Sequence, residues 1–395
     1  MSTTRQPVTG PLLGLRILDL TRLLPGPLGT MLMADMGADV IKIEDPGAPD
    51  YVRAFPPYVN GESANYMAYN RSKRSVFLAY QTPEGRAQFL ALVKTADVVV
   101  EQFRPGHLDL LGMGYEAARA VNPRIIYVSV TGYGQTGPYA HLAGHDLNYI
   151  ALAGVLGLTG ESGTGGEPHP PVVPGVQLAD IAGGSYGCVM ATLAAIYARE
   201  RTGEGQHVDV SMTDAVMPLL SVAYASFAGG QPPVRGAMPL SGGLPNYGVY
   251  LCRDGRYAAL GTLEPKFWQK FCTLIGKPDW LAFSQPASAT QLTDFKARLQ
   301  TVFLERNCDE WTRFGLENDI LITPVNTLAD LETDPHLTAR QMVVTQTHPV
   351  AGPFRSIGVP LKFSGTPARP AWPAPAPGED TDDILAQTLG NPPPA

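Results

Sequence analysis

The chain has 395 residues, 44% of them hydrophobic, and a formal net charge of −7 at pH 7. This length is enough for two or three domains, each with its own hydrophobic core. The negative charge argues against a general nucleic-acid-binding protein, because neutralising phosphates needs a basic excess or a basic face.

Residues 15–130 alternate between apolar strands and helices. This alternation is typical of βαβ units, and it predicts an α/β fold with a doubly wound parallel sheet. The turn Pro25-Gly26-Pro27 lacks the GxGxxG fingerprint, which leaves a dinucleotide site only weakly supported. The expected strands are 15–20, 37–44, 97–101 and 125–130, and the expected helices are 28–36, 83–96 and 115–120.

Residues 143–152 place a histidine beside a carboxylate at the start of a predicted helix. The apolar spacing from Leu147 onward predicts one buried helix face, so His145 lies at the helix N-terminus, where free N–H groups favour negative charge. An imidazole takes and gives protons near neutral pH. The position therefore suits proton abstraction beside a carbonyl oxygen that becomes anionic, although a structural capping histidine is the alternative.

Asp180 follows a long Gly- and Pro-rich loop, residues 157–174, and precedes a helix that runs to Arg199. Loops of this length inside a domain are usually functional or mobile. Capping of the helix is the ordinary explanation for Asp180. Gly183 and Gly184 directly after it allow another backbone or a ligand to approach closely, which favours a functional role.

A second, smaller α+β domain is expected after the break at residues 229–233. A strand at 208–210 and a helix at 214–227 come before the break. The sequence Arg253-Asp-Gly-Arg256 between two apolar runs is a strong hairpin signal, and Glu264 stands at the cap of the next helix. From about residue 321 the chain becomes extended and proline-rich, and we expect it to return to the first domain.

Cysteine and histidine spacing indicates neither disulfides nor a metal site. The four cysteines have no CxxC spacing, and residues 1–10 lack the apolar core of a signal peptide, so a cytoplasmic location is expected. His141 and His145 are spaced HxxxH, but Gly144 separates them and no clear third ligand follows, so we expect no metal. Apolar stretches such as 189–198 are too short and interrupted to span a bilayer, so no membrane association is expected.

The most specific motif of the chain is Gly144-His-Asp-Leu-Asn-Tyr149, and three further motifs accompany it: Gly37-Ala-Asp-Val-Ile-Lys-Ile-Glu44, Phe103-Arg-Pro-Gly106 and Thr202-Gly-Glu-Gly-Gln206. By their order and number these motifs resemble the family III CoA-transferase (CaiB/BaiF) superfamily, and within it the 2-methylacyl-CoA racemases. The resemblance implies a Rossmann-like large domain, 1–210 completed by 326–395, a linker at 211–229 and a small domain at 230–325. It also implies an interlocked ring homodimer, with each active site between the large domain of one subunit and the small domain of the other.

In racemases of this family, the residues matching His145 and Asp180 are the two acid/base groups, and the glutamate matching Glu264 orients the histidine. Inverting the carbon beside a thioester needs a base on one face and an acid on the other. The principal alternative is CoA transfer, in which Asp180 attacks the thioester and no histidine base is needed. Transferases of the family usually lack a histidine at this position, so His145 favours proton transfer.

The resemblance also assigns CoA-binding positions, and it implies no cofactor beyond the CoA moiety of the acyl-CoA substrate. Relatives often carry an arginine just after the second strand, where this chain has Asp45, so Lys42 or Arg71 is expected to replace it. The N–H of Asp146 is a candidate donor to the enolate oxygen. The expected phosphate-binding cations are Lys42, Arg71, Lys73, Arg74 and Arg104, and the residues expected near the thioester are Gly144, Asp146 and Tyr149.

Two further alternatives are a non-catalytic CoA- or nucleotide-binding protein and a nicotinamide-dependent reductase. All three acid/base positions are filled, which argues against the first, and the absent glycine fingerprint argues against the second. The acyl group stays open. Racemases tend to carry asparagine and aspartate where this chain has Met238 and Ser241, in a loop that borders the acyl pocket in the family.

Overall fold

The computed structural model describes residues 7–161, 169–285 and 288–390, and the chain divides into two compact units. The first unit consists of Met1–Ala153, Gly175–Leu219 and Asp334–Ala395. The second consists of Gly154–Pro174 and Leu220–Thr333. The second unit thus begins inside the expected linker and also takes in the Gly- and Pro-rich loop.

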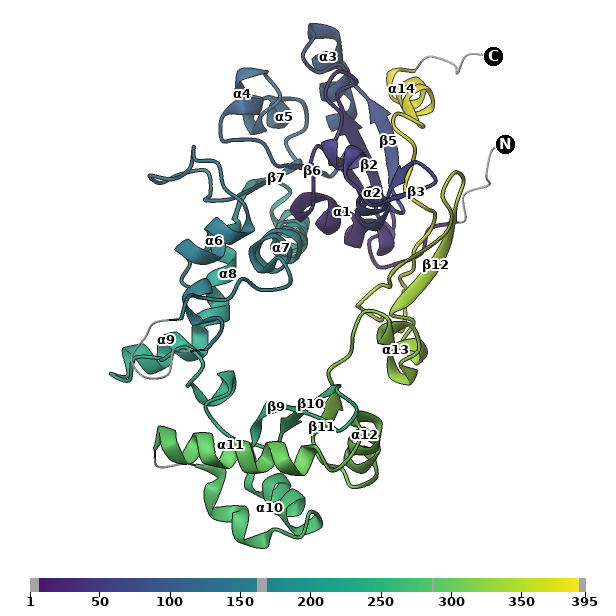
Figure 1. The fold of residues 1–395 in the computed structure, drawn as a ribbon. Coiled ribbons are helices and arrows are strands. Elements are labelled where there is room, and N and C mark those ends of the chain that lie inside the picture. Colours follow the sequence, from purple (N-terminus) through teal and green to yellow (C-terminus); the bar gives the residue numbers. More distant parts are fainter. Residues whose placement is uncertain (1–6, 162–168, 286–287, 391–395) are drawn as a thin grey trace. The chain divides into compact units, whose positions relative to one another are not determined.

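The first unit is built on a six-stranded parallel sheet with the order β5-β2-β1-β6-β7-β8 (Figure 1). This is the doubly wound order of the Rossmann fold, with the first strand at the centre. The predicted large parallel sheet is therefore confirmed. The strands are β1 (Arg16–Asp19), β2 (Asp39–Glu44), β5 (Arg74–Phe77), β6 (Val98–Glu101), β7 (Ile126–Thr131) and β8 (His207–Ser211).

Helices and two small ladders complete the first unit. The core on one side of the sheet joins strand residues such as Leu18 and Val99 to Phe89 of α3 and Ile384 of α14, so the C-terminal helix packs beside the N-terminal half of the sheet. The helices are α1 (Pro25–Asp35), α2 (Ala64–Asn70), α3 (Pro83–Val93), α4 (His107–Leu110), α5 (Tyr115–Val121), α6 (Asp146–Leu152), α7 (Gly187–Thr202), α8 (Met212–Val216), α13 (Pro335–Ala339) and α14 (Thr381–Leu389), and the ladders pair β3 (Tyr58–Val59) with β4 (Glu62–Ser63) and β12 (Val343–His348) with β13 (Gly352–Ile357).

Two predicted helix boundaries are wrong. Helix α1 begins at Pro25 and includes the sequence expected to be a turn, because proline suits a first helical turn, where the N–H has no intrahelical partner. The N–H of Gly26, in the same first turn, donates to Oε1 of Gln102 at 3.0 Å. The helix expected at 214–227 is split into α8, a 3₁₀ turn at Met217–Leu220 and α9 (Ser221–Ala228), and the boundary between the units falls there.

Residues Ala179–Thr202 form one continuous helix, whose first part, Ala179–Tyr186, has wide π-helical turns that lead into α7. By length and apolar composition this helix is able to cross a membrane, whereas the sequence pattern predicted stretches too short to do so. Core helices of soluble proteins meet the same criteria, so the helix is weak evidence for a membrane protein.

Gly183 and Gly184 let this helix pack tightly against its neighbours. A Cβ atom at Gly183 would lie 2.6 Å from the carbonyl oxygen of Met212 in α8. One at Gly184 would lie 2.6 Å from Cβ of Pro25 in α1. The close approach expected at these glycines is therefore made by the protein's own helices.

The second unit has a three-stranded antiparallel sheet with the order β11-β10-β9 and helices that cover one face of it. The predicted hairpin is present, since Leu251 of β9 pairs with Tyr257 of β10 across the Arg253–Arg256 turn. Trp268, Phe271 and Trp311 are fully buried in the core beneath it. The elements are β9 (Tyr247–Leu251), β10 (Tyr257–Gly261), β11 (Ile322–Pro324), α9 (Ser221–Ala228), α10 (Pro265–Leu274), α11 (Ala289–Phe303) and α12 (Cys308–Glu317).

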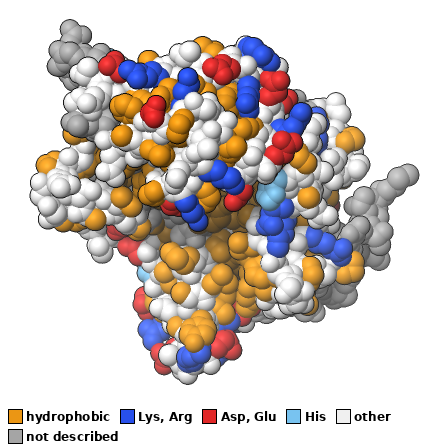
Figure 2. Space-filling view, turned by 90° about the horizontal axis from the view of Figure 1, so that it is seen from below, with side chains coloured by type: hydrophobic (Ala, Val, Ile, Leu, Met, Phe, Trp, Pro, Cys, Tyr) orange, Lys and Arg blue, Asp and Glu red, His pale blue; other side chains and the backbone are white. Residues whose placement is uncertain are grey.

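Large apolar side chains remain exposed on helices of both units. On α7, Met190 is 69% exposed and Tyr197 is 63% exposed. On α9, Val222 and Tyr224 are 64% and 63% exposed. Figure 2 shows hydrophobic side chains interspersed among charged ones over one face of the molecule. Scattered exposed apolar side chains are normal on a protein surface, whereas contiguous apolar patches are typical of surfaces that a partner covers.

Candidate active site

A cavity of about 330 Å³ in the first unit lies at the carboxyl ends of the parallel strands. Its wall includes Pro25 after β1 and residues 102–105 after β6. These two strands are neighbours at the centre of the sheet, where the strand order reverses, and ligands of open α/β sheets bind at that point. His145, Asp180, Tyr149, Gly144 and Arg104 all line the cavity.

His145 is the residue that precedes α6, as the sequence predicted. Its backbone N–H donates to Oδ1 of Asn148 at 3.0 Å, which fixes the start of the helix. The hydroxyl of Tyr149 donates to the carbonyl oxygen of Gly144, and a Cβ at Gly144 would lie 2.7 Å from the Tyr149 ring. The imidazole is exposed on the cavity wall, and His145 and Asn148 together form the capping box of α6. The exposed imidazole can therefore meet a substrate.

Asp180 lies in the first turn of the helix that begins at Ala179, again as predicted. Burial and the neighbouring negative charge of Asp146 raise the pKa of the Asp180 carboxyl to about 6, although His145 acts in the opposite direction. A carboxyl group with this pKa exists in both protonation states near neutral pH. The structure thus places a histidine and a carboxyl group with a raised pKa in one cavity.

Asp146 does not present its carboxylate to the cavity as a ligand group. Its Oδ1 accepts the backbone N–H groups of Ala179 at 2.6 Å and of Asp180 at 2.9 Å. Only the Asp146 backbone N–H, at the first position of α6, remains for the predicted contact with a thioester oxygen.

Three of the predicted phosphate-binding cations are buried in ion pairs, which corrects the expectation. Lys42 pairs with Asp50 at 3.0 Å, and both side chains are fully buried. Arg71 pairs with Asp35 at 2.8 Å. Lys73 pairs with Asp19 at 2.9 Å, also fully buried. A phosphate in solvent cannot reach these groups, because each one is buried against a carboxylate of the first unit.

Asp19 is the centre of this buried network. It accepts hydrogen bonds from Lys73 Nζ at 2.9 Å and Thr30 Oγ1 at 2.7 Å. Burial acts to raise the pKa of Asp19, but the charges of Lys73 and Lys42 outweigh it and lower this pKa to about 2. Burial in turn lowers the pKa of Lys73 to about 8 despite the attraction of Asp19.

The other two predicted cations have different surroundings. Arg74 is partly exposed and pairs with Asp39, which also pairs with Arg16 at 2.9 Å, so the two arginines share one carboxylate. Arg104 is exposed, lines the cavity and has no side-chain partner in the described parts of the chain. Among the five, Arg104 is the one that the structure leaves available to an anionic ligand.

Sequence reasoning missed Gln102 and Thr131, which also line the cavity. Gln102 ties β6 to α1 through Gly26. The hydroxyl of Thr131 is buried without a hydrogen-bond partner among the described residues. Both follow or end parallel strands, and that position is the signal that would have identified them.

Glu264 belongs to the second unit, at the predicted cap of α10. Its backbone carbonyl accepts the N–H groups of Phe267 and Trp268 at 3.0 and 3.1 Å. Its side chain is exposed and makes no cap hydrogen bond. The carboxylate is therefore available for a contact outside its own helix, and its role toward His145 stays a prediction.

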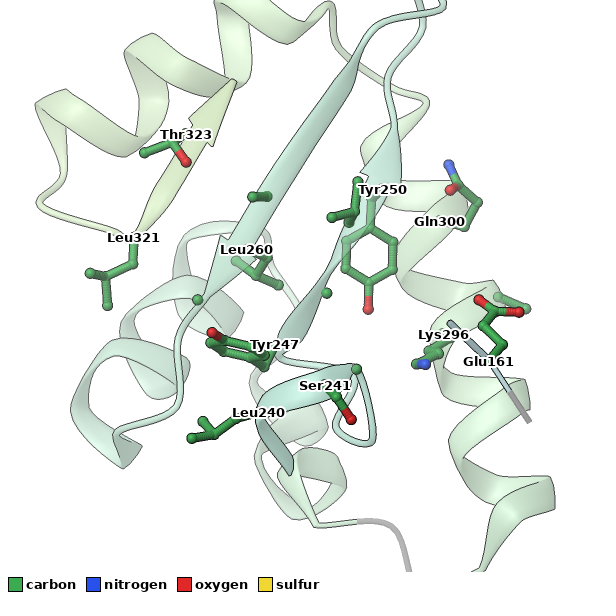
Figure 3. A pocket seen from close by; sticks show the side chains of 16 residues that line it. Glu161, Leu240, Ser241, Tyr247, Tyr250, Leu260, Lys296, Gln300, Leu321 and Thr323 are labelled. Carbon is green, nitrogen blue, oxygen red and sulfur yellow. The ribbon is translucent and has the colours of Figure 1, made fainter. Parts of the chain in front are cut away.

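The second unit contains a larger cavity, of about 900 Å³, beside its sheet. Figure 3 shows Lys296 and Glu161 on one side of it and Leu321 and Thr323 on the other. Ser241, one of the two positions where this chain departs from the racemase pattern, also lines it. The wall is mainly apolar, with Lys296 as a cationic group.

Comparison with known proteins identifies a single protein family whose sequence pattern extends over both units. The sequence model of CoA-transferase family III matches residues 12–381. Succinyl-CoA:glutarate CoA-transferase of Mus musculus is 33% identical over 386 residues, covering 96% of this chain and 86% of that protein. Alpha-methylacyl-CoA racemase of Homo sapiens is 33% identical over 378 residues, covering 95% and 92%. The crystal structure of a CaiB/BaiF family protein from Brucella suis has a TM-score of 0.81 at 33% identity, covering 96% of this chain and all of that one.

Proposed function

We propose, from the premise that this chain belongs to CoA-transferase family III, that it interconverts the stereoisomers of 2-methylacyl-CoA thioesters. The observation that carries the proposal is that His145 and Asp180 line the same cavity. Stereochemical inversion needs a second group that can hold a proton, whereas simple CoA transfer does not need one.

In the proposed reaction, one group removes the α-proton of the thioester and the other returns a proton to the opposite face of the planar enolate. In one direction, neutral His145 is the base and protonated Asp180 is the acid; in the other, the roles are reversed. A pKa of about 6 for Asp180 supports both roles near neutral pH. Such general acid–base catalysis contributes about 10²- to 10⁴-fold to a rate.

The enolate oxygen needs donors where its charge develops. The backbone N–H of Asp146, in the first turn of α6, is suited to this role because the first N–H groups of a helix have no intrahelical partner. Arg104 is suited to a phosphate of CoA, which is part of the substrate; no further cofactor is proposed.

The proposed active form is an interlocked homodimer in the cytoplasm, in which Glu264 of a second copy orients His145. The exposed Glu264 carboxylate, which makes no cap hydrogen bond in its own helix, and the exposed His145 imidazole support this pairing. Exposed apolar side chains such as Met190 and Tyr197 on α7 support a covering partner.

CoA transfer between carboxylic acids is the second candidate, and the similarity to succinyl-CoA:glutarate CoA-transferase favours it. Ionised Asp180 would attack the thioester carbonyl, releasing CoA thiolate and leaving a mixed anhydride. The thiolate would then attack the Asp180 carbonyl, releasing the first acid and forming an aspartyl-CoA thioester for the acceptor acid. His145 has no necessary part in these steps.

Incubation of a 2-methylacyl-CoA in deuterated water, with and without succinate, tests the proposal by mass spectrometry. We expect α-deuterium in the recovered thioester without succinate, and loss of that exchange in His145→Ala. His141→Ala is the matched control, because His141 is exposed and does not line the cavity. Succinyl-CoA formation without α-exchange, unaffected by His145→Ala, would replace the racemase proposal with the transferase.

A further inference from the structure

The carboxylate of Asp146 joins the two segments that carry His145 and Asp180. Asp146 is the first residue of α6 and follows His145 directly. Its Oδ1 holds the N–H groups of Ala179 and Asp180, which lie 33 and 34 residues further along the chain. The backbone at Asp180 is therefore attached to the residue next to His145.

The helix that starts at Ala179 depends on this contact for its cap. Leu178, at its N-cap position, has no side chain that can accept a hydrogen bond, and no side-chain cap is formed there. Asp146 supplies the missing acceptor from another helix. A carboxylate at this end also complements the positive end of the helix dipole.

Asp146 also places a negative charge close to the Asp180 carboxyl group. Burial is the largest cause of the raised Asp180 pKa, and Asp146 is the next; His145 opposes both. Burial, and after it the charge of Asp180, raises the pKa of Tyr149 on α6, so this side chain stays neutral. In the described chain, α1 and α8, which pack against the same helix, contribute no charge to this balance.

From the proposed racemase function, we propose that Asp146 is a positioning residue: its carboxylate holds the backbone of Asp180 beside His145, and its negative charge favours the protonated form of the Asp180 carboxyl group. The proton is what the mechanism requires, because both productive forms of the pair, whichever member is the base, carry one proton. Asp146 itself neither gives nor takes it.

Three variants separate the charge of Asp146 from its hydrogen bonds. Asp146→Asn keeps an acceptor oxygen for the two N–H groups but removes the charge, and Asp146→Ala removes both. Asp334→Asn is the matched control, because Asp334 accepts the N–H of Leu337 at 2.9 Å as the cap of α13 and does not line the cavity.

Titration of the Asp180 carboxyl carbon by ¹³C NMR measures the charge effect independently of catalytic activity. The signal of this carbon is assigned because it is missing from the spectrum of Asp180→Asn. We expect the pKa of Asp180 to fall below the value of about 6 in Asp146→Asn and to be unchanged in Asp334→Asn. The pH profile of α-deuterium exchange should move to lower pH in Asp146→Asn, with about a tenfold loss on its alkaline side for each unit of movement. Asp146→Ala should in addition lose rate at its own optimum.

The inference would be overturned if Asp180 titrated in Asp146→Asn as it does in the wild type and Asp146→Ala only lowered the unfolding temperature. Asp146 would then act only as the cap of the helix that starts at Ala179. If the titration moves but the wild type exchanges no α-proton, the racemase proposal fails while the electrostatic role of Asp146 stands.

Discussion

Replacing Lys73 by methionine tests whether the buried cations stabilise the fold or bind CoA. The Lys73 ammonium is fully buried and donates to Asp19, to the carbonyl oxygen of Pro27 and to Asn70, at 2.8–2.9 Å. Methionine keeps the apolar stem and leaves the Asp19 carboxylate without its partner. Breaking a buried ion pair by removing one member costs about 3–5 kcal/mol. For a unit of this size, the unfolding temperature should fall by about 6–20 °C.

Differential scanning calorimetry and the KM for the acyl-CoA give the two measurements. Arg104→Met, at the exposed cation of the cavity, should change stability by less than about 0.5 kcal/mol but raise KM about 10- to 100-fold, the worth of one charge-assisted contact. Lys94→Met, at an exposed lysine after α3, should change neither. An unchanged unfolding temperature with a raised KM in Lys73→Met would refute the assignment of Lys73 to the fold.

Three further predictions concern the site. The pH profile of the exchange activity should be bell-shaped and identical from both enantiomers, because the reaction needs one proton on the pair of His145 and Asp180. The titration of Asp180 places one limb of this profile near pH 6. A kcat/KM that rises with pH to a plateau would instead indicate a lone carboxylate nucleophile. Co-expression of His145→Ala with Glu264→Gln should restore activity that neither variant shows alone, since a site shared between subunits leaves one intact site per mixed dimer; no recovery would place both residues in one chain's site. Gly183→Ala should lower stability by about 1–3 kcal/mol in chemical denaturation, because its Cβ would lie 2.6 Å from the Met212 carbonyl oxygen, and an unchanged midpoint would show that α8 shifts freely.

Local patterns predicted much of the fold and the place of the two central groups. The alternation of strands and helices up to residue 130 was enough for a parallel sheet, because parallel strands require crossover connections. The apolar spacing after His145 and after Asp180 was enough to put each at a helix start. Hydrophobic periodicity and helix termini are properties of neighbouring residues, so the sequence displays them directly.

What a charged side chain does depends on partners that are distant in the chain. Lys73 was expected to bind a phosphate of CoA, but the fold brings Asp19, 54 residues earlier, against it in the core. Asp146 appeared to be a ligand contact, and the fold turns its carboxylate toward the N–H groups at Asp180.

The sequence by itself determined the family, the parallel sheet and the helix starts that carry His145 and Asp180, since these follow from local spacing and from motifs in a fixed order. Only the tertiary structure decided which cations are exposed, with Arg104 on the surface and Lys73 buried, and that burial together with the neighbouring Asp146 raises the pKa of Asp180. The physical reason is that charge interactions depend on distance and burial in three dimensions, and neither quantity is a property of neighbouring residues in a chain.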